Sequence, residues 1–219
     1  MANYQIIKDE EILANFLEWL PELEEGECYY VVLLARNKYV RDLPGVSLPH
    51  IRSDKQQLAR IVCDKKSLRN RIKQLECEIG AYRTRDGDVM PSEALALYIT
   101  PNPRSHILAT KEAIKMMADY LTSKYNGYRL DQDVISCIQR NCSRKVYFDL
   151  DFDGVNLTDT AAQIVQHINA DCLKVLETRG GFHVLVKLSD IDSKYKRSWY
   201  NSITSLAGVD VRGDNLVPV

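Results

Sequence analysis

The sequence predicts an α/β (α+β) fold, and two stretches carry most of that prediction. Residues 146–154 alternate strictly between apolar and polar side chains, which is the pattern of a strand with one buried face. Two β-rich runs at 173–178 and 183–188 flank a Gly-Gly pair, which is typical of a β-hairpin. Helical patterns lie between the other strand patterns, and the sequence has no internal repeat, so we expect one mixed domain.

Composition excludes several broad classes of function. Hydrophobic residues make up 45% and charged residues 27% of the 219-residue chain, as in ordinary globular proteins. The 29 basic residues nearly balance the 30 acidic ones, so nucleic-acid binding would depend on local patches. No apolar run approaches the roughly 18 residues that span a bilayer, and the first residues lack a signal-peptide pattern. We therefore expect a cytoplasmic protein without membrane contact. The six cysteines are scattered, which predicts reduced thiols rather than structural zinc.

The first two thirds of the chain predict a small α/β module followed by helices. The expected elements are a helix at 8–20, a strand at 28–35, a loop at 44–53, a helix at 64–78, a strand at 94–100, and helices at 107–125 and 131–140. Arg36 and Lys38 leave the first strand, where they could meet phosphate or simply lie in a solvated loop. In the helix at 107–125, the stripe of Ile114, Met117 and Leu121 predicts a buried face.

The strand at 146–154 lines up three carboxylates on its polar face. Asp149, Asp151 and Asp153 recur every second residue, so neighbouring ones lie about 6 to 7 Å apart. Carboxylates this close repel one another unless a cation neutralises them. The row is therefore a candidate ligand set for Mg²⁺ or Mn²⁺, and a strand end that places acids in water is the alternative.

The remaining third predicts a helix, a hairpin, another helix and a final strand. The helices are expected at 158–169 and 195–206, and the final strand at 216–219. If Gly180 and Gly181 form the hairpin turn, Thr178 opposes His183 across the ladder, and a hydroxyl and an imidazole share one face. A histidine without a role is the alternative at position 183.

In this order, three motifs resemble the archaeo-eukaryotic primase superfamily, in its primase-polymerase branch. The first motif is Val-Tyr-Phe-Asp-Leu-Asp at 146–151, and the second runs from Thr178 to His183. The third is best matched by Gly-Val-Asp at 208–210, where Asp214 competes with Asp210 for the role. Segments 34–39 and 102–104 are also similar to the N-terminal module of such proteins.

The resemblance implies an architecture and an activity. It implies an N-terminal α/β module at 1–105, a helical connector at 106–142 and an RRM-like catalytic half at 143–219, as part of a longer chain. The activity would be template-directed nucleotidyl transfer from NTPs or dNTPs, which makes or extends primers on single-stranded DNA. A C-terminal helper or helicase domain would be the partner in the rest of that longer chain.

The resemblance also implies roles for particular residues. Asp149, Asp151 and Asp210 would hold two Mg²⁺ or Mn²⁺ ions. The incoming nucleotide would be bound by His183 and by the residues of the hairpin turn, which are Thr178, Arg179, Gly180 and Gly181. Template phosphates would be contacted by Arg36, Lys38 and Arg104.

Three other interpretations compete with this one. Asp-Phe-Asp-Gly at 151–154, followed by Asp159, is similar to the first motif of haloacid-dehalogenase-type phosphohydrolases, with Asp151 as the nucleophile. Against it, the strand ending at Thr178 turns straight back instead of entering a helix. An EF-hand calcium loop is nearly excluded, because its position 12 is Thr160 and its flank is β. A non-catalytic nucleic-acid-binding domain of the same family is the third.

Overall fold

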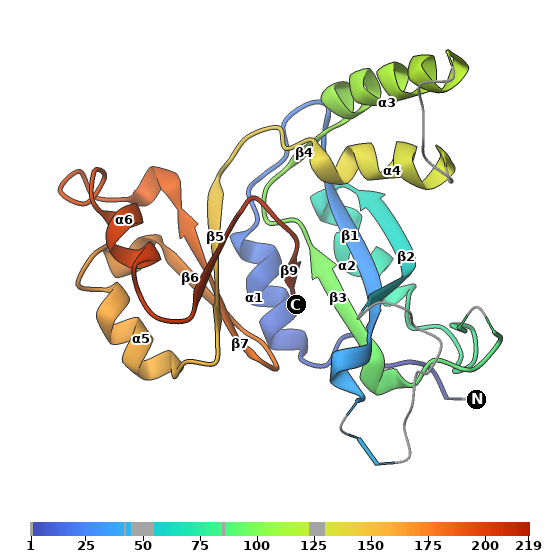
Figure 1. Cartoon of the computed structure of the whole chain (residues 1–219), viewed down its shortest axis with the longest axis horizontal. Coiled ribbons are helices and arrows are strands. Elements are labelled where there is room, and N and C mark those ends of the chain that lie inside the picture. Colours follow the sequence, from blue (N-terminus) through green and yellow to red (C-terminus); the bar gives the residue numbers. More distant parts are fainter. Residues whose placement is uncertain (1, 42, 45–54, 85, 123–129) are drawn as a thin grey trace.

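The computed structural model describes residues 2–41, 43–44, 55–84, 86–122 and 130–219. These residues form two antiparallel sheets and six α-helices, and Figure 1 shows the two sheets side by side. The mixed α/β fold class predicted from the sequence is therefore confirmed. The loop expected at 44–53 lies almost wholly outside the described residues. None of the described helices is long and apolar enough to cross a membrane.

The first sheet has the strand order β2-β1-β3-β9. Its strands are β1 (Glu27–Arg36), β2 (Lys55–Cys63), β3 (Leu95–Ile99) and β9 (Val217–Pro218), and the short β4 (Arg104–Ser105) pairs with the start of β1. Strand β1 is central and almost fully buried, as its Tyr-Tyr-Val-Val-Leu-Leu run predicts. Strand β9 brings the end of the chain back to β3, so the first sheet is not built from residues 1–105 alone.

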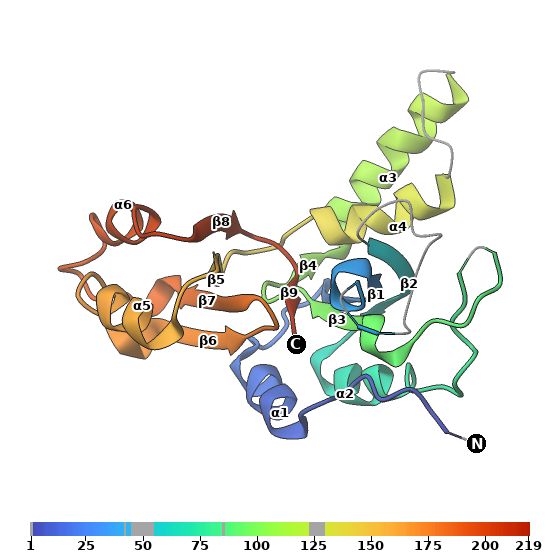
Figure 2. The ribbon, with the colours of Figure 1, turned by 60° about the horizontal axis from the view of Figure 1, so that its bottom comes forward.

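Two helices cover one face of the first sheet. They are α1 (Glu10–Trp19) and α2 (Lys65–Lys73), and Figure 2 shows both on the same side of that sheet. Their buried apolar residues share a core with β1, because helices with one apolar stripe are stable only when that stripe is covered. Asp9 and Asp64 cap the two helices by accepting backbone N–H hydrogen bonds. Strand β2 was not predicted from the sequence, because its first residues, a lysine and two glutamines, do not form an apolar strand pattern.

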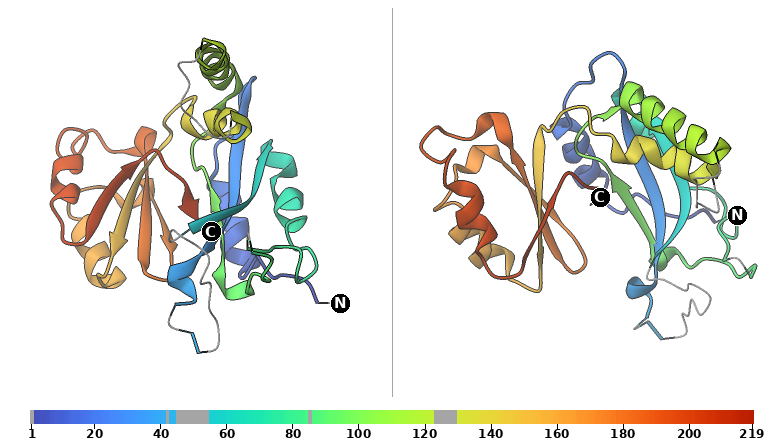
Figure 3. Two further views of the ribbon diagram at one scale, coloured as in Figure 1. Left: turned by 45° about the vertical axis from the view of Figure 1, so that its right-hand side comes forward. Right: turned by 45° about the horizontal axis from the view of Figure 1, so that its top comes forward.

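A pair of helices lies at one end of the first sheet. These are α3 (His106–Leu121) and α4 (Leu130–Arg140), which pack against each other in Figure 3. The prediction that Ile114, Met117 and Leu121 face inward is wrong, because their exposed fractions are 61%, 49% and 80%. Helix α3 contacts the rest of the chain mainly through its N-terminal end and α4, so only a short part of its stripe can be covered.

The second sheet has the order β6-β7-β5-β8. Its strands are β5 (Tyr147–Asp153), β6 (Leu173–Glu177), β7 (Gly181–Lys187) and β8 (Val209–Gly213). Helices α5 (Leu157–Ile164) and α6 (Trp199–Thr204) cover the face that carries Leu150 and Phe152. The alternation predicted for β5 therefore places Asp149 and Asp151 on the other face, which is turned towards the first sheet.

The register of the β6–β7 hairpin differs from the predicted one. Leu176, not Thr178, lies opposite His183. The turn closes with a 2.9 Å hydrogen bond from the Thr178 N–H to the Gly181 carbonyl, so Gly181 is the first residue of β7 rather than part of the turn. The reason is a close approach, because a Cβ atom at position 181 would lie 1.9 Å from the carbonyl oxygen of Phe152.

We expect Gly181→Ala to destabilise the protein strongly, because its methyl group must push β7 away from β5. The free energy of unfolding, measured with urea, should fall by about 3 kcal/mol, at the upper end of overpacking effects. Gly180→Ala is the matched control, since its Cβ would meet only the Asp153 side chain at 3.5 Å. That variant should stay within about 0.5 kcal/mol of wild type. Equal effects at both positions would contradict the close-approach argument.

Candidate functional site

Three polar residues form a row across three neighbouring strands of the second sheet. Asp151 on β5 lies directly opposite His183 on β7 and directly opposite Asp210 on β8. Residues that face each other across antiparallel strands project to the same side, so the three side chains share one face. The antiparallel ladder thus brings together residues that are far apart in the sequence.

The two ring nitrogens of His183 lie close to two carboxylates of β5. Its Nδ1 atom lies 2.9 Å from Asp149 Oδ1, and its Nε2 atom lies 3.5 Å from Asp151 Oδ1. Asp149 is completely buried, and among the described residues its Oδ2 atom has no hydrogen-bond partner. Burial raises the pKa of Asp149, although the hydrogen bond with His183 opposes the shift. Burial alone would lower the pKa of His183, but Asp149 and Asp151 together raise it.

Arg212 neutralises the other side of the row. Its Nη2 atom lies 3.1 Å from Asp151 Oδ2 and 2.8 Å from Asp210 Oδ2. Strand β8 carries a β-bulge here, because Leu150 pairs with Val211 while Asp149 pairs with Gly213. Gly213 has a φ of 68°, which a residue without a side chain adopts without strain. The bulge leaves Arg212 out of the ladder and beside the carboxylates, as bulges near functional sites often do.

A polar pocket of about 250 Å³ lies between the two sheets. Asp151, Asp153 and His183 line it from the second sheet. From the first sheet and the segment after β1, its lining includes three basic residues and two tyrosines, which are Arg36, Lys38, Lys55, Tyr39 and Tyr98. An acidic wall faces a basic wall across one cavity. That arrangement suits a ligand that carries phosphate groups together with a divalent cation.

The residues of the hairpin turn divide into two groups. Thr178 and Gly180, two of the residues to which the family resemblance gives a nucleotide-binding role, line the pocket. Arg179 instead lies over the Tyr39 ring, 4.4 Å from its centroid, and donates a 2.8 Å hydrogen bond to the Glu93 carbonyl. Its guanidinium therefore joins the hairpin to the two short helical turns, Asn37–Tyr39 and Ser92–Ala94, that precede β2 and β3.

Arg104 lies inside the protein rather than on a loop that faces a template. Only 1% of its surface is exposed, and its guanidinium pairs with the carboxylate of Asp214, with Nη1 at 2.9 Å from Oδ2. Although burial opposes the shift, the hydrogen bonds and charge of Arg104 hold the pKa of Asp214 below its usual value. Asp214 is therefore committed to Arg104. Asp210 is the carboxylate that faces Asp151, so we leave Arg104 and Asp214 out of the proposed site.

The donor types fit a hard divalent cation, but the carboxylates are not gathered into a ready-made cage. Among the described residues, no group of three or more His, Cys, Asp or Glu side chains is placed to hold one ion. Asp151 and Asp210 are joined through Arg212, and Asp149 is joined to His183. The partnerless Oδ2 of Asp149 is the observation that favours a cation, because a buried carboxylate oxygen without a partner costs free energy.

Sequence reasoning overlooked several residues of this site. Arg212 lies two residues after Asp210, yet no motif assigned it a role. Tyr39 and Tyr98 line the pocket, but only the folded chain brings them there. Asp153 also lines it, and this residue had already been placed in the row of three carboxylates by the alternation of β5.

Comparisons of this chain with models of protein families, with curated proteins and with solved structures found no match. Its function must therefore be argued from the site itself.

We expect Asp214→Asn to lower the free energy of unfolding at pH 7 by about 3 kcal/mol, because it leaves the buried Arg104 charge unpaired. The Asp214 pKa is lowered on folding, so this stabilisation is present above the unfolded value of about 3.9 and is lost as pH falls through the folded value. Urea unfolding from pH 7 to pH 3 should show the gap between wild type and variant narrowing in acid.

Asp210→Asn is the control for that experiment, because the Asp210 side chain is 56% exposed. It should cost less than about 1 kcal/mol at any pH. A loss from Asp214→Asn as small as this would contradict the assignment of Asp214 to a structural pair.

Proposed function

We propose that this chain is a metal-dependent nucleotidyltransferase of the archaeo-eukaryotic primase superfamily, which makes or extends primers on a single-stranded DNA template. One observation carries the proposal. Asp151, His183 and Asp210 come from three separate motifs of the sequence, and they lie in register on adjacent strands and on one face. Asp151 and His183 of this row line a pocket with basic residues opposite, which suits the handling of a nucleoside triphosphate.

The topology of the second sheet supports the same assignment. Its elements follow the order β5-α5-β6-β7-α6-β8, with both helices on one face and the sheet order β6-β7-β5-β8. This order of elements is similar to the βαββαβ arrangement of ferredoxin-like folds, which supports the RRM-like catalytic half that the proposal requires. Fold alone does not specify chemistry, so an activity depends on the residues of the face that carries Asp149 and Asp151.

The proposed roles follow from where each side chain lies. Asp151 and Asp210 would bind Mg²⁺ or Mn²⁺, together with the partnerless Oδ2 atom of the buried Asp149. The bound cations would lower the pKa of the attacking 3′-hydroxyl and stabilise the leaving pyrophosphate. His183 is held by Asp149 through Nδ1, and its Nε2 lies 3.5 Å from Asp151 Oδ1, at the pocket that both residues line, where Nε2 would donate to a triphosphate oxygen.

The basic wall of the pocket is the proposed contact for phosphate groups. The guanidinium of Arg36 donates to the Tyr98 hydroxyl and lies 5.7 Å from the centroid of the Tyr39 ring. Lys38 lies 5.6 Å from the centroid of the same ring. The two cations are therefore presented from an ordered aromatic platform. Such a surface can track a backbone without reading the base sequence.

The two alternative functions are less well supported. In the phosphohydrolase interpretation Asp151 is the nucleophile, but here its carboxylate is engaged by Arg212 and the neighbours of β5 are both antiparallel. Ligand sites of open α/β sheets instead lie at the carboxyl ends of parallel strands. A non-catalytic nucleic-acid-binding domain would keep the basic wall but would not need the carboxylates to bind a cation.

The decisive experiment incubates the protein with single-stranded DNA, labelled nucleotides and Mn²⁺ or Mg²⁺, with p-nitrophenyl phosphate as a parallel substrate. We expect template-dependent products that fall more than about 100-fold in Asp151→Asn and in Asp210→Asn. The reason is that loss of even an outer-shell partner of a metal costs about 10- to 100-fold. The matched control is Asp192→Asn, an exposed aspartate after β7.

Each outcome of that assay separates the candidates. Phosphate release from p-nitrophenyl phosphate without nucleotide incorporation would favour the phosphohydrolase. Binding of single-stranded DNA with neither activity would favour the non-catalytic domain. Incorporation that survives both aspartate substitutions would refute the assignment of the site.

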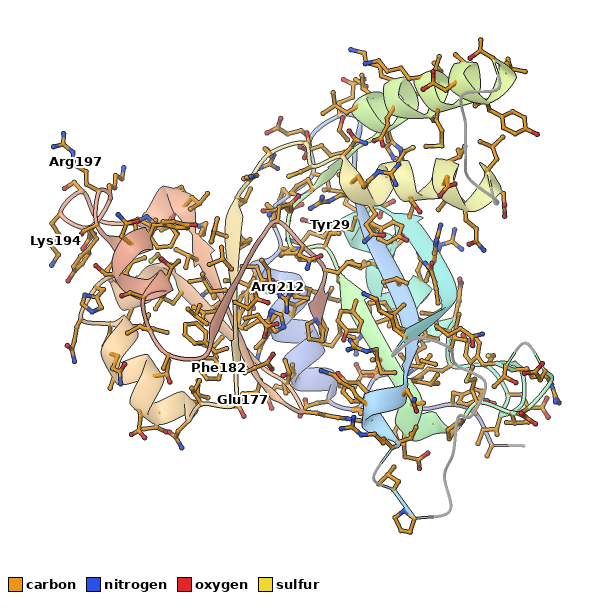
Figure 4. All side chains as sticks on the ribbon, in the orientation of Figure 1. Tyr29, Glu177, Phe182, Lys194, Arg197 and Arg212 are labelled. Atoms are coloured by element: carbon orange, nitrogen blue, oxygen red, sulfur yellow. The ribbon has the colours of Figure 1, made fainter. Side chains whose placement is uncertain are left out.

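We expect charge reversal at Arg36 and Lys38 to weaken binding of single-stranded DNA and to flatten its salt dependence. Each lost phosphate contact should reduce the slope of log affinity against log salt by about 0.7. Fluorescence anisotropy of a labelled oligonucleotide, without nucleotides or metal, measures both quantities. Lys194→Glu is the control, because Figure 4 places Lys194 beyond the second sheet, at the end of the molecule farthest from the first sheet. An unchanged slope in the Arg36→Glu/Lys38→Glu variant would contradict the proposed contact.

A further inference from the structure

Arg212 bridges Asp151 and Asp210, the two carboxylates proposed above to bind a divalent cation. We propose that Arg212 is an internal counter-ion, which holds the two carboxylates together without metal and is displaced into the pocket when metal binds. This inference rests on the proposed function, since it concerns the same carboxylates. It adds that metal binding and nucleotide binding are coupled through one side chain.

The contacts of Arg212 are those of a bridging cation. A single nitrogen, Nη2, lies 3.1 Å from Asp151 Oδ2 and 2.8 Å from Asp210 Oδ2, and Nε lies 3.3 Å from the same Asp151 oxygen. Asp151 and Asp210 face each other in register, so without a cation between them the two carboxylates would repel. Figure 4 shows Arg212 in the middle of the molecule, between the two sheets.

The bridge is exposed enough to be replaced. The Arg212 side chain is 38% exposed and that of Asp210 is 56% exposed, whereas the Arg104–Asp214 pair has exposures of 2% and 15%. Partly exposed pairs contribute little net stability, because water competes for both charges. A divalent cation concentrates twice the charge in a smaller volume and so can compete for the same oxygens.

The displaced guanidinium has a defined destination. Arg212 lines the pocket of about 250 Å³ together with His183 and the basic residues of the opposite wall. Released from the carboxylates, its planar fork would be available to phosphate oxygens, for which arginine geometry is well suited. Metal entry would therefore supply the pocket with one additional cation for a triphosphate, and the triphosphate in turn would keep Arg212 away from the metal ligands.

The test measures binding of Mn²⁺ directly, by titrating the metal-free protein and following free Mn²⁺ by electron paramagnetic resonance. We expect Arg212→Gln to bind Mn²⁺ roughly five- to tenfold more tightly than wild type in the absence of nucleotide, because the competing cation is gone. Arg197→Gln is the matched control, since it removes the same charge at the far end of the second half in Figure 4. Its Mn²⁺ affinity should stay within twofold of wild type.

A second titration tests the coupling. In wild type, a non-hydrolysable nucleoside triphosphate should tighten Mn²⁺ binding, and Mn²⁺ should tighten triphosphate binding by the same factor. In Arg212→Gln, the factor by which triphosphate tightens Mn²⁺ binding should be smaller, because only the direct contact between metal and triphosphate then contributes to it. Arg212→Lys keeps the charge but loses the additional Nε contact to Asp151, so its Mn²⁺ affinity should lie between those of wild type and Arg212→Gln.

The outcomes separate this inference from the proposed function. Tighter Mn²⁺ binding with reduced coupling in Arg212→Gln supports the counter-ion role. Equal Mn²⁺ affinity in wild type and Arg212→Gln overturns it while leaving the metal site intact. Loss of Mn²⁺ binding in Arg212→Gln, with an unchanged free energy of unfolding, also overturns it. An absence of Mn²⁺ binding in every variant overturns both the inference and the metal site of the proposed function.

Discussion

The arrangement of the two sheets depends on a small buried junction where the chain passes from one to the other. Asn102 accepts hydrogen bonds at Oδ1 from the backbone N–H groups of Val146 and Tyr147, and its amide donates to the Tyr147 carbonyl and to Asp214. Arg104 pairs with the same aspartate. The start of β5 and the end of β8 are thus fixed against the first sheet at one point. Because β5 carries Asp151 and β8 carries Asp210, the junction also fixes where the acidic wall meets the basic wall.

The candidate site places several carboxylates close together, and such carboxylates repel one another unless positive groups lie beside them. Three carboxylates share one face of a sheet, and each is compensated by a side chain of the same sheet. Asp149 forms a hydrogen-bonded pair with His183, at a position where burial disfavours a single unpaired charge. Asp151 and Asp210 share Arg212. Their partners explain how such a concentration of acid can exist in a folded chain, and they define what any incoming cation must displace.

The sequence was informative where local pattern determines local structure. The alternation in β5 correctly assigned Leu150 and Phe152 to the core and Asp149 and Asp151 to the opposite face. It could not set the hairpin register, because that depends on the contact between Gly181 and Phe152, which belong to different strands. Nor could it settle the choice between Asp210, which matches the motif better, and Asp214, since the two lie only four residues apart in one short segment. Only tertiary structure shows that one faces Asp151 and the other faces Arg104. Arg212 was missed because its role arises from a bulge, which has no reliable sequence signature.

The return of β9 to the first sheet has a consequence for how the molecule folds. Arg104 and Asp214 are separated by 110 residues, and β3 obtains its outer neighbour only when Val217 and Pro218 are present. The buried Arg104 can be neutralised by Asp214, and the first sheet completed by β9, only after residues 214–218 have been synthesised. Contacts between residues so distant in sequence slow folding, because the entropy of closing a long loop must be lost before they form.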